Sequence, residues 1–167
     1  MVKLPDQRIA VFVDVQNLYH SAKNLFNARV NFAEVLKEAV AKRKLIRAVA
    51  YVIKSPTQEE QKFLEALDKQ GFELKIKDLQ IFAGGAKKGD WDVGLVIDAI
   101  KMAPQLDVVI LVSGDGDYVP AVEYLQYHGK KVEVIAFGET SSVKLKEVAD
   151  DFIDLSWDPK KFLLKLK

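Results

Sequence analysis

Cysteine is absent from this chain of 167 residues, and histidine occurs only twice. Without cysteine the protein has no disulfide bond and no thiolate metal site, which fits a reducing compartment. His20 and His128 do not form a pair by their spacing. We interpret both histidines as surface or core residues, and His20 as a weak candidate for a substrate contact.

Long apolar runs and an excess of one charge are lacking as well. No run approaches the roughly 20 residues of a membrane span, and residues 1–8 lack the apolar core of a signal peptide. A formal net charge of +1 creates no overall field toward nucleic acid or a membrane, so any basic patch must be local. With 49% hydrophobic and 29% charged residues, the composition predicts one globular domain in a soluble, cytoplasmic protein.

Predicted strands and helices alternate along the chain. Apolar runs indicate strands at residues 9–13, 45–53, 108–112 and 132–137, with an alternating edge strand at 72–77 and a last short extended piece at 152–155. Helices are expected at residues 15–27, 32–42, 58–69, 91–102, 119–127 and 143–149, with Asn31, Thr57 and Asp90 as N-caps of the second, third and fourth. Right-handed crossovers then give a parallel sheet with helices on both faces.

The stretch Ser113-Gly114-Asp115-Gly116-Asp117 directly follows a strand that is apolar throughout. Ligands bind along the carboxyl edge of such sheets, so both aspartates are aimed at one pocket. Glycines beside Asp115 let the backbone turn sharply and let a ligand come close. Two carboxylates this near each other repel unless a cation lies between them. The alternative is a turn followed by a helix N-cap.

Asp14 occupies the same position at the end of the first strand. Asn17 follows in the first turn of a helix, where its amide can face the same crevice and where anions such as phosphate are favoured. The alternatives are an N-cap for Asp14 and a capping partner for Asn17. If the first strand neighbours the strand at 108–112, Asp14 and Asp115 meet where the strand order reverses.

Acidic and basic residues also surround the helix expected at 91–102. Lys87 and Lys88 lie in a glycine-rich segment before it, which is either a solvated loop or a phosphate-contacting loop. Asp92 lies in the first helical turn and can point at the crevice. Asp98 lies inside an apolar run and needs a partner, because a buried, unpaired carboxylate is costly. That partner is either a backbone group or hydroxyl near the site, or the cation of a salt bridge.

If Asp14, Asp92, Asp115 and Asp117 converge, they form a hard site of oxygen ligands. Such a site suits Mg²⁺ or Mn²⁺ rather than zinc, and it leaves positions for water and phosphate oxygens. That is the machinery of phosphodiester hydrolysis. Substrate-binding candidates are Lys54, Lys87, Lys88 and the helix N-termini.

Three segments resemble the NYN domain, a PIN-like nuclease fold, and more closely its LabA-like branch. They are FVDVQNLY at 12–19, KGDWDV at 88–93 with Asp98 after it, and LVSGDGDY at 111–118. The resemblance spans residues 8–156. It implies a five-stranded parallel sheet, with its strands in the order third, second, first, fourth, fifth, and a metal-dependent ribonuclease-like site.

By position in this family, the resemblance assigns the metal-binding acids to Asp14, Asp92, Asp115 and Asp117, with Asn17 and Ser113 beside them. Asp92 is favoured over Asp90 because the family places a valine directly after its aspartate. Asp98 matches a recurring acidic position whose role is left open.

We therefore expect a metal-dependent endoribonuclease acting on single-stranded RNA. The alternative is a non-catalytic regulatory domain that binds RNA, a nucleotide or a protein through the same pocket. A haloacid-dehalogenase phosphatase would need an acid where Gln16 stands, and a receiver domain would need a lysine after Phe137-Gly138. The domain is expected over residues 1–156, with a basic amphipathic tail over 157–167 that packs on the domain or on a partner in a homodimer. The alternative for the tail is a role at nucleic acid or at a membrane surface.

Overall fold

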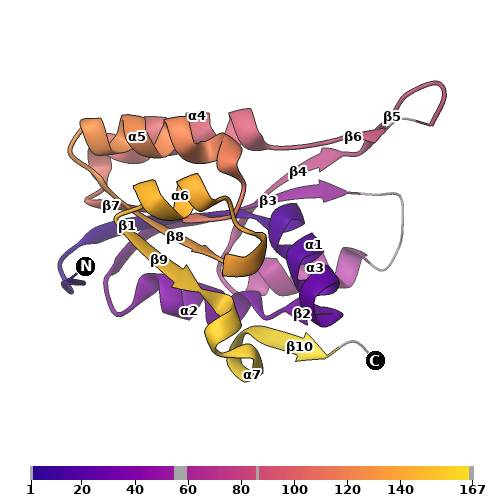
Figure 1. The fold of residues 1–167 in the computed structure, drawn as a ribbon, viewed down its shortest axis with the longest axis horizontal. Helices are drawn as coiled ribbons and strands as arrows, with labels where there is room; N and C mark the ends of the chain where they lie inside the picture. The colour runs from indigo at the N-terminus through magenta and orange to yellow at the C-terminus, as the bar shows by residue number, and fades with distance from the viewer. Residues whose placement is uncertain (1, 55–59, 86, 166–167) are drawn as a thin grey trace.

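One parallel sheet of six strands organises the molecule, in the order β4-β3-β1-β7-β8-β9 (Figure 1). The computed structural model describes residues 2–54, 60–85 and 87–165. The strands are β4 (Glu73–Asp78), β3 (Lys44–Lys54), β1 (Arg8–Asp14), β7 (Val108–Val112), β8 (Lys131–Ala136) and β9 (Asp151–Asp154). The predicted parallel arrangement and the order of the first five strands are confirmed.

The prediction of five strands was wrong, because β9 adds a sixth in parallel beside β8. Its register runs from Glu133 opposite Asp151 to Ala136 opposite Asp154. The short extended piece expected near this position has an aspartate at each end of the strand and no strong alternation. It forms a strand because it pairs with the open edge of β8, and the local sequence does not reveal that this edge is available.

Helices cover both faces of the sheet. On one face lie α1 (Val15–Phe26), α2 (Phe32–Val40) and α3 (Glu60–Lys69), and on the other α4 (Asp92–Met102), α5 (Val119–Tyr127) and α6 (Val143–Val148) (Figure 1). Alternate residues of β1 enter opposite cores: Val11 packs with the first group of helices and Phe12 with the second. Burial on both faces explains why these strands are apolar throughout.

Most helix ends lie within two residues of the prediction. Asn31 is the N-cap of α2, as expected, since its Oδ1 accepts the N–H of Glu34 at 3.3 Å. The expected cap of α3 at Thr57 lies outside the described residues. The prediction for α4 was wrong by one residue: Trp91 is the N-cap, and Oδ1 of Asp90 instead accepts the N–H of Asp92 at 3.1 Å.

Short elements complete the fold. The 3-10 helices within the described residues are η1 (Ala103–Gln105), η2 (Gly116–Tyr118), η3 (Gly138–Thr140) and η4 (Leu155–Trp157). The segment between β4 and α4 contains the antiparallel pair β5 (Gln80–Ile81) and β6 (Lys87–Lys88), which projects from the carboxyl end of the sheet (Figure 1). Among the described residues, no helix combines the length and apolarity that a membrane crossing requires.

The tail packs on the domain. It forms α7 (Pro159–Phe162) and then β10 (Leu163–Lys165), which pairs antiparallel with β2 (Ala28–Val30). The N–H of Asn31 donates to the carbonyl of Phe162 at 2.8 Å, and the Phe162 ring is buried in the same core as α1 and α2. The tail is therefore a structural part of the α1–α2 side rather than a free amphipathic turn.

Candidate metal centre

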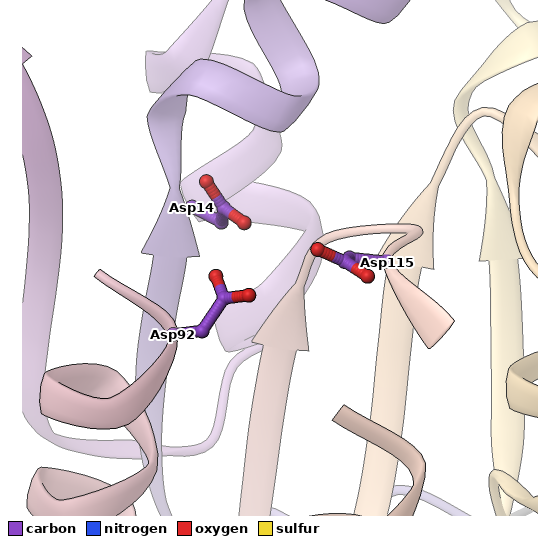
Figure 2. Close-up of side chains that lie close together, drawn as sticks. All are labelled: Asp14, Asp92 and Asp115. Atoms are coloured by element: carbon purple, nitrogen blue, oxygen red, sulfur yellow. The ribbon is translucent and has the colours of Figure 1, made fainter. Parts of the chain in front are cut away.

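Three aspartates from separate elements meet at the carboxyl edge of the sheet. Asp14 ends β1, Asp115 follows β7, and Asp92 is the first residue of α4. One carboxylate oxygen from each lies within 4.8 Å of the others, and Figure 2 shows the three side chains converging. The pairing of Val13 with Val112 brings the ends of β1 and β7 together. The predicted meeting of Asp14 and Asp115 thus follows from the parallel register.

Asp14 is fixed by several hydrogen bonds. Its Oδ1 accepts the N–H of Asn17 at 3.2 Å, so it also caps α1. Its Oδ2 lies 3.2 Å from the hydroxyls of both Ser113 and Tyr118. Burial raises the pKa of Asp14 above its usual value, although these hydrogen bonds oppose the rise. Asp14 therefore both caps α1 and belongs to the cluster.

Asp115 is held by the turn that follows β7. Its Oδ1 accepts the N–H of Asp117 at 2.9 Å, and its own N–H donates to Oγ of Ser113 at 3.2 Å. Asp117 is exposed in η2. Within the described residues, the cluster consists of Asp14, Asp92 and Asp115, so the expected convergence of four acids is reduced to three.

The carboxylate of Asp92 is strongly affected by its surroundings. Burial, with further contributions from the charges of Asp115 and Asp14, raises the pKa of Asp92 to about 6. None of the salt bridges among the described residues involves a cluster acid. Carboxylates that are close, partly buried and without a basic partner favour binding of a cation, because the cation relieves their repulsion.

The donor set fits a hard divalent ion. All three side chains offer carboxylate oxygen, and neither nitrogen nor sulfur ligands belong to the cluster that the described residues form. Oxygen ligands suit Mg²⁺, Mn²⁺ or Ca²⁺, and a site with few protein ligands leaves positions for water and phosphate oxygens.

Tyr118 is a member of the site that sequence reasoning missed. Its hydroxyl lies 3.2 Å from Oδ2 of Asp14 and 3.0 Å from Oδ1 of Asp92, and it can donate its single proton to one of them at a time. The side chain is buried, and both burial and the neighbouring carboxylates raise the pKa of its hydroxyl. The signal was its place directly after Asp117, at the end of the segment LVSGDGDY.

Similarity to known proteins agrees with this site. The family model described as "NYN domain" matches residues 8–156. The chain belongs to the NYN domain family. NYN domains are part of the PIN-like nuclease superfamily, and the three-acid cluster is compatible with metal binding there.

Relatives of this NYN domain occur in distant organisms. It is 26% identical to "Low amplitude and bright protein LabA" of Synechococcus elongatus over 95% of this chain and 88% of that protein. It is 30% identical to the uncharacterized protein MJ0482 of Methanocaldococcus jannaschii over 90% of this chain and 56% of that longer protein. The crystal structure of VPA0982, a Vibrio parahaemolyticus protein of unknown function, has a TM-score of 0.87 and 36% identity, covering 98% of this chain and all of that one.

Asn17 and Ser113 hold the acidic loop of the NYN domain. Oδ1 of Asn17 accepts the N–H of Gly114 at 2.9 Å, which ties α1 to the turn after β7. The Ser113 side chain is buried, and its hydroxyl joins Asp14 to the backbone of Asp115. A direct contact of Asn17 or Ser113 with substrate stays a prediction.

A neighbouring loop accounts for the glycine at position 114. A Cβ there would clash with Oγ of Ser141 and would lie 3.0 Å from its Cα. Oγ of Ser141 is already engaged with the carbonyl of Phe137 at 2.7 Å, and the N–H of Ser142 donates to the carbonyl of Gly114 at 2.9 Å. The absence of a side chain thus lets the loop after β8 pack against the acidic turn.

Of the three lysines predicted to bind substrate, only Lys54 has a side chain within the described part of the structure. Lys54 is half-buried at the end of β3, three positions beyond Tyr51, the residue paired with Asp14. The side chains of Lys87 and Lys88 lie outside the described part of the structure. Their contact with phosphate stays a prediction.

Asp90 and Asp98 are not members of the three-acid cluster that the described residues form. Asp90 is exposed, and its carboxylate caps the N–H of Asp92. Asp98 accepts the hydroxyl of Tyr51 at 2.7 Å and Nζ of Lys75 at 2.6 Å. Burial would raise the pKa of Asp98, but these two hydrogen bonds and the charge of Lys75 lower it below its usual value. Asp98 therefore has both of the partners considered for it, a hydroxyl and a cation.

Proposed function

We propose that this NYN domain is a metal-dependent endoribonuclease that hydrolyses phosphodiester bonds of single-stranded RNA with Mg²⁺ or Mn²⁺. The observation that carries the proposal is the convergence of Asp14, Asp92 and Asp115 within 4.8 Å at the carboxyl edge of the sheet. This edge is where open α/β sheets bind their ligands. Membership of the PIN-like superfamily supports the same chemistry.

Each acid has a proposed role at this site. Asp14, Asp92 and Asp115 hold the ion, and Asp117 is a proposed fourth acid at the exposed rim. When bound, a divalent ion supplies positive charge that polarises the phosphodiester and offsets the charge of the carboxylates. Tyr118 and Ser113 donate hydrogen bonds that keep the carboxylate of Asp14 oriented before substrate arrives.

The substrate class is proposed from charge. The overall net charge of +1 creates no general field toward the two backbones of a duplex, so the positive charge that binds nucleic acid must be local. Lys54, at the end of β3, and Lys87 and Lys88, in β6 shortly before Asp92, supply local positive charge to one flexible strand.

The test is cleavage of labelled single-stranded RNA. Wild type, Asp14→Asn, Asp115→Asn and the matched control Asp68→Asn are compared in Mn²⁺, in Mg²⁺ and in chelator; Asp68 is exposed on α3, away from the cluster. We expect metal-dependent cleavage by wild type and control, and a loss of at least about 100-fold in both site variants, since an ion stabilises the transition state by several kcal/mol.

Other outcomes separate the alternatives. Cleavage that persists in both site variants would indicate a contaminating nuclease. RNA binding without cleavage in every condition would contradict the enzyme and favour a regulatory domain that uses the same pocket. Neither binding nor cleavage would reject RNA as the partner.

A further inference from the structure

The indole of Trp91 attaches the turn that leads into α4 to the sheet. Its Nε1–H donates to the carbonyl of Val52 on β3 at 3.0 Å. Its ring meets the ring of Tyr51 edge to face, with centroids 5.4 Å apart. Nζ of Lys77 on β4 lies 4.3 Å from the indole centroid and donates to the carbonyl of Asp90 at 3.2 Å. The indole and the backbone before it are thus attached to two strands.

The first turn of α4 is shaped to accept this ring. A Cβ at Gly94 would lie 2.7 Å from Cε3 of Trp91, so the indole packs directly against the helix where glycine stands. Glycine in a helix interior costs about 1 kcal/mol relative to alanine. Contact with Trp91 accounts for a glycine at this position of the helix.

A second attachment lies further along the same helix. Tyr51, whose ring contacts Trp91, donates its hydroxyl to Asp98, and Lys75 of β4 donates to the same oxygen of Asp98. Tyr51 is fully buried, so it has little freedom to move. Asp98 and Trp91 therefore hold α4 on β3 and β4 at two points, with Asp92 between them.

Asp92 needs such support. It is the first residue of α4, and in the described structure the Trp91 side chain makes no capping bond to the helix. Ends of helices fray, because their first N–H groups lack partners within the helix. The carboxylates of Asp14 and Asp115 also repel that of Asp92.

We propose that Trp91 is a positioning residue: with Tyr51, Lys77 and Asp98 it holds the first turn of α4 so that Asp92 stays beside Asp14 and Asp115. This set of contacts is named the α4 latch. The inference rests on the proposed function only where it concerns the ion. It assigns Asp98 to the latch and excludes it from the ligands.

The first test needs no metal. Hydrogen exchange is measured on wild type, Trp91→Phe, Trp91→Ala and the control Trp157→Phe, since Trp157 is 75% exposed. The N–H of Leu95, bonded to the carbonyl of Trp91 at 2.8 Å, reports the first turn. We expect its exchange to rise by about 10-fold in Trp91→Phe, which loses one hydrogen bond, and by more in Trp91→Ala.

Amides of β1 and β7 serve as the internal reference. Their exchange should not change in Trp91→Phe, because the sheet does not depend on the latch. Unchanged exchange at Leu95 in both Trp91 variants would overturn the proposal. An equal rise throughout the sheet would also overturn it, since the indole would then support the whole fold rather than one turn.

The second test asks whether Trp91 acts through Asp92. Mn²⁺ affinity is measured by electron paramagnetic resonance for Trp91→Phe alone and combined with Asp92→Asn or Asp14→Asn. We expect about 10-fold weaker binding from Trp91→Phe in the wild-type and Asp14→Asn backgrounds, and no further loss in Asp92→Asn. A further 10-fold loss in the Asp92→Asn background would overturn the proposal.

The two tests separate the proposals. If the wild type binds no Mn²⁺, the proposed metal-dependent function fails, and the exchange of Leu95 alone supports or overturns the latch. If the wild type binds Mn²⁺ and Trp91→Phe binds it equally well, the latch fails while the metal site stands.

Discussion

Side chains of the acidic cluster combine structural and chemical tasks. Asp14 caps α1 while facing Asp92, and Asp115 caps η2 while facing both. A capping bond fixes the carboxylate relative to the backbone, which reduces the reorganisation required when an ion binds. The capping interpretation and the metal interpretation of these residues are therefore compatible.

Asp92 predicts a pH dependence of stability. Because burial raises its pKa from 3.8 to about 6, the native state disfavours the charged form. The contribution of Asp92 is fully favourable below pH 3.8 and is lost as the pH rises through 6. We expect Asp92→Asn to increase the free energy of unfolding in chelator at pH 7 by on the order of 1 kcal/mol, a value reduced for partial exposure, and to have little effect at pH 3.5.

Urea denaturation at the two pH values checks this expectation, with Asp68→Asn as the control on the exposed surface. The reasoning about Asp92 would be contradicted by a stabilisation of equal size at both values. Loss of stability at pH 7 would mean that its hydrogen bond with Tyr118 outweighs the repulsion in the cluster.

Three short strands each depend on a neighbouring strand. β2, β9 and β10 contain three or four residues each, too few to form from local preference. Each is stabilised by a strand that lies elsewhere in the sequence: β9 by β8, and β2 and β10 by one another. This dependence explains why the C-terminal segment is part of the domain.

Phe162 should anchor that segment. Its side chain is 4% exposed in the core beneath α1 and α2, whereas Leu164, two residues later in β10, is 46% exposed. We expect Phe162→Ala to lower the free energy of unfolding by about 3 kcal/mol and Leu164→Ala by less than about 1 kcal/mol. Denaturant titration measures both, and similar values for the two variants would show that the segment is not anchored by its aromatic residue.

At the scale of the whole molecule, one buried ion pair joins distant segments. Arg43, which precedes β3, and Glu133 of β8 both have fully buried side chains and are joined by bonds of 2.7 and 2.9 Å. The guanidinium also donates to Gln7 and to the carbonyls of Ala39 and Val40. Every donor of Arg43 is therefore satisfied, which makes its burial tolerable.

Breaking this pair should be costly, because one charge would stay buried without its partner. We expect Glu133→Gln to lower the free energy of unfolding by about 3–5 kcal/mol. The exposed pair of Arg47 and Glu73 is the control, and Glu73→Gln should cost no more than about 1 kcal/mol. Urea denaturation measures the free energy of unfolding of both variants. Equal decreases would contradict the expectation that burial makes the loss of Glu133 more costly.

Ion binding should stabilise the entire fold. A ligand that binds only the native state at 100 times its Kd adds about 2.7 kcal/mol, equivalent to about 5–10 °C in Tm for a chain of this size. We expect a rise of this size for the wild type in saturating Mn²⁺ and a smaller rise for Asp115→Asn at the same concentration. Calorimetry provides the measurement, and an identical rise in both proteins would remove Asp115 from the ligands.

By itself the sequence determined the elements whose signals are local. Continuous apolar runs predicted the buried strands, and the order of strands and helices predicted the parallel sheet. Placement of Asp14 and Asp115 directly after such strands predicted that they meet, because parallel strands carry their carboxyl ends to one edge.

Only the tertiary structure decided the features that need a partner from elsewhere in the chain. The pairing of β9 depends on the open edge of β8, and the exposed position of Asp117 beside the three-acid cluster depends on the turn of η2. Tyr118, the last residue of η2, reaches the acids because η2 lies beside α4. These outcomes depend on hydrogen bonds and space between segments that are distant along the chain, whereas local sequence encodes only burial, periodicity and turns.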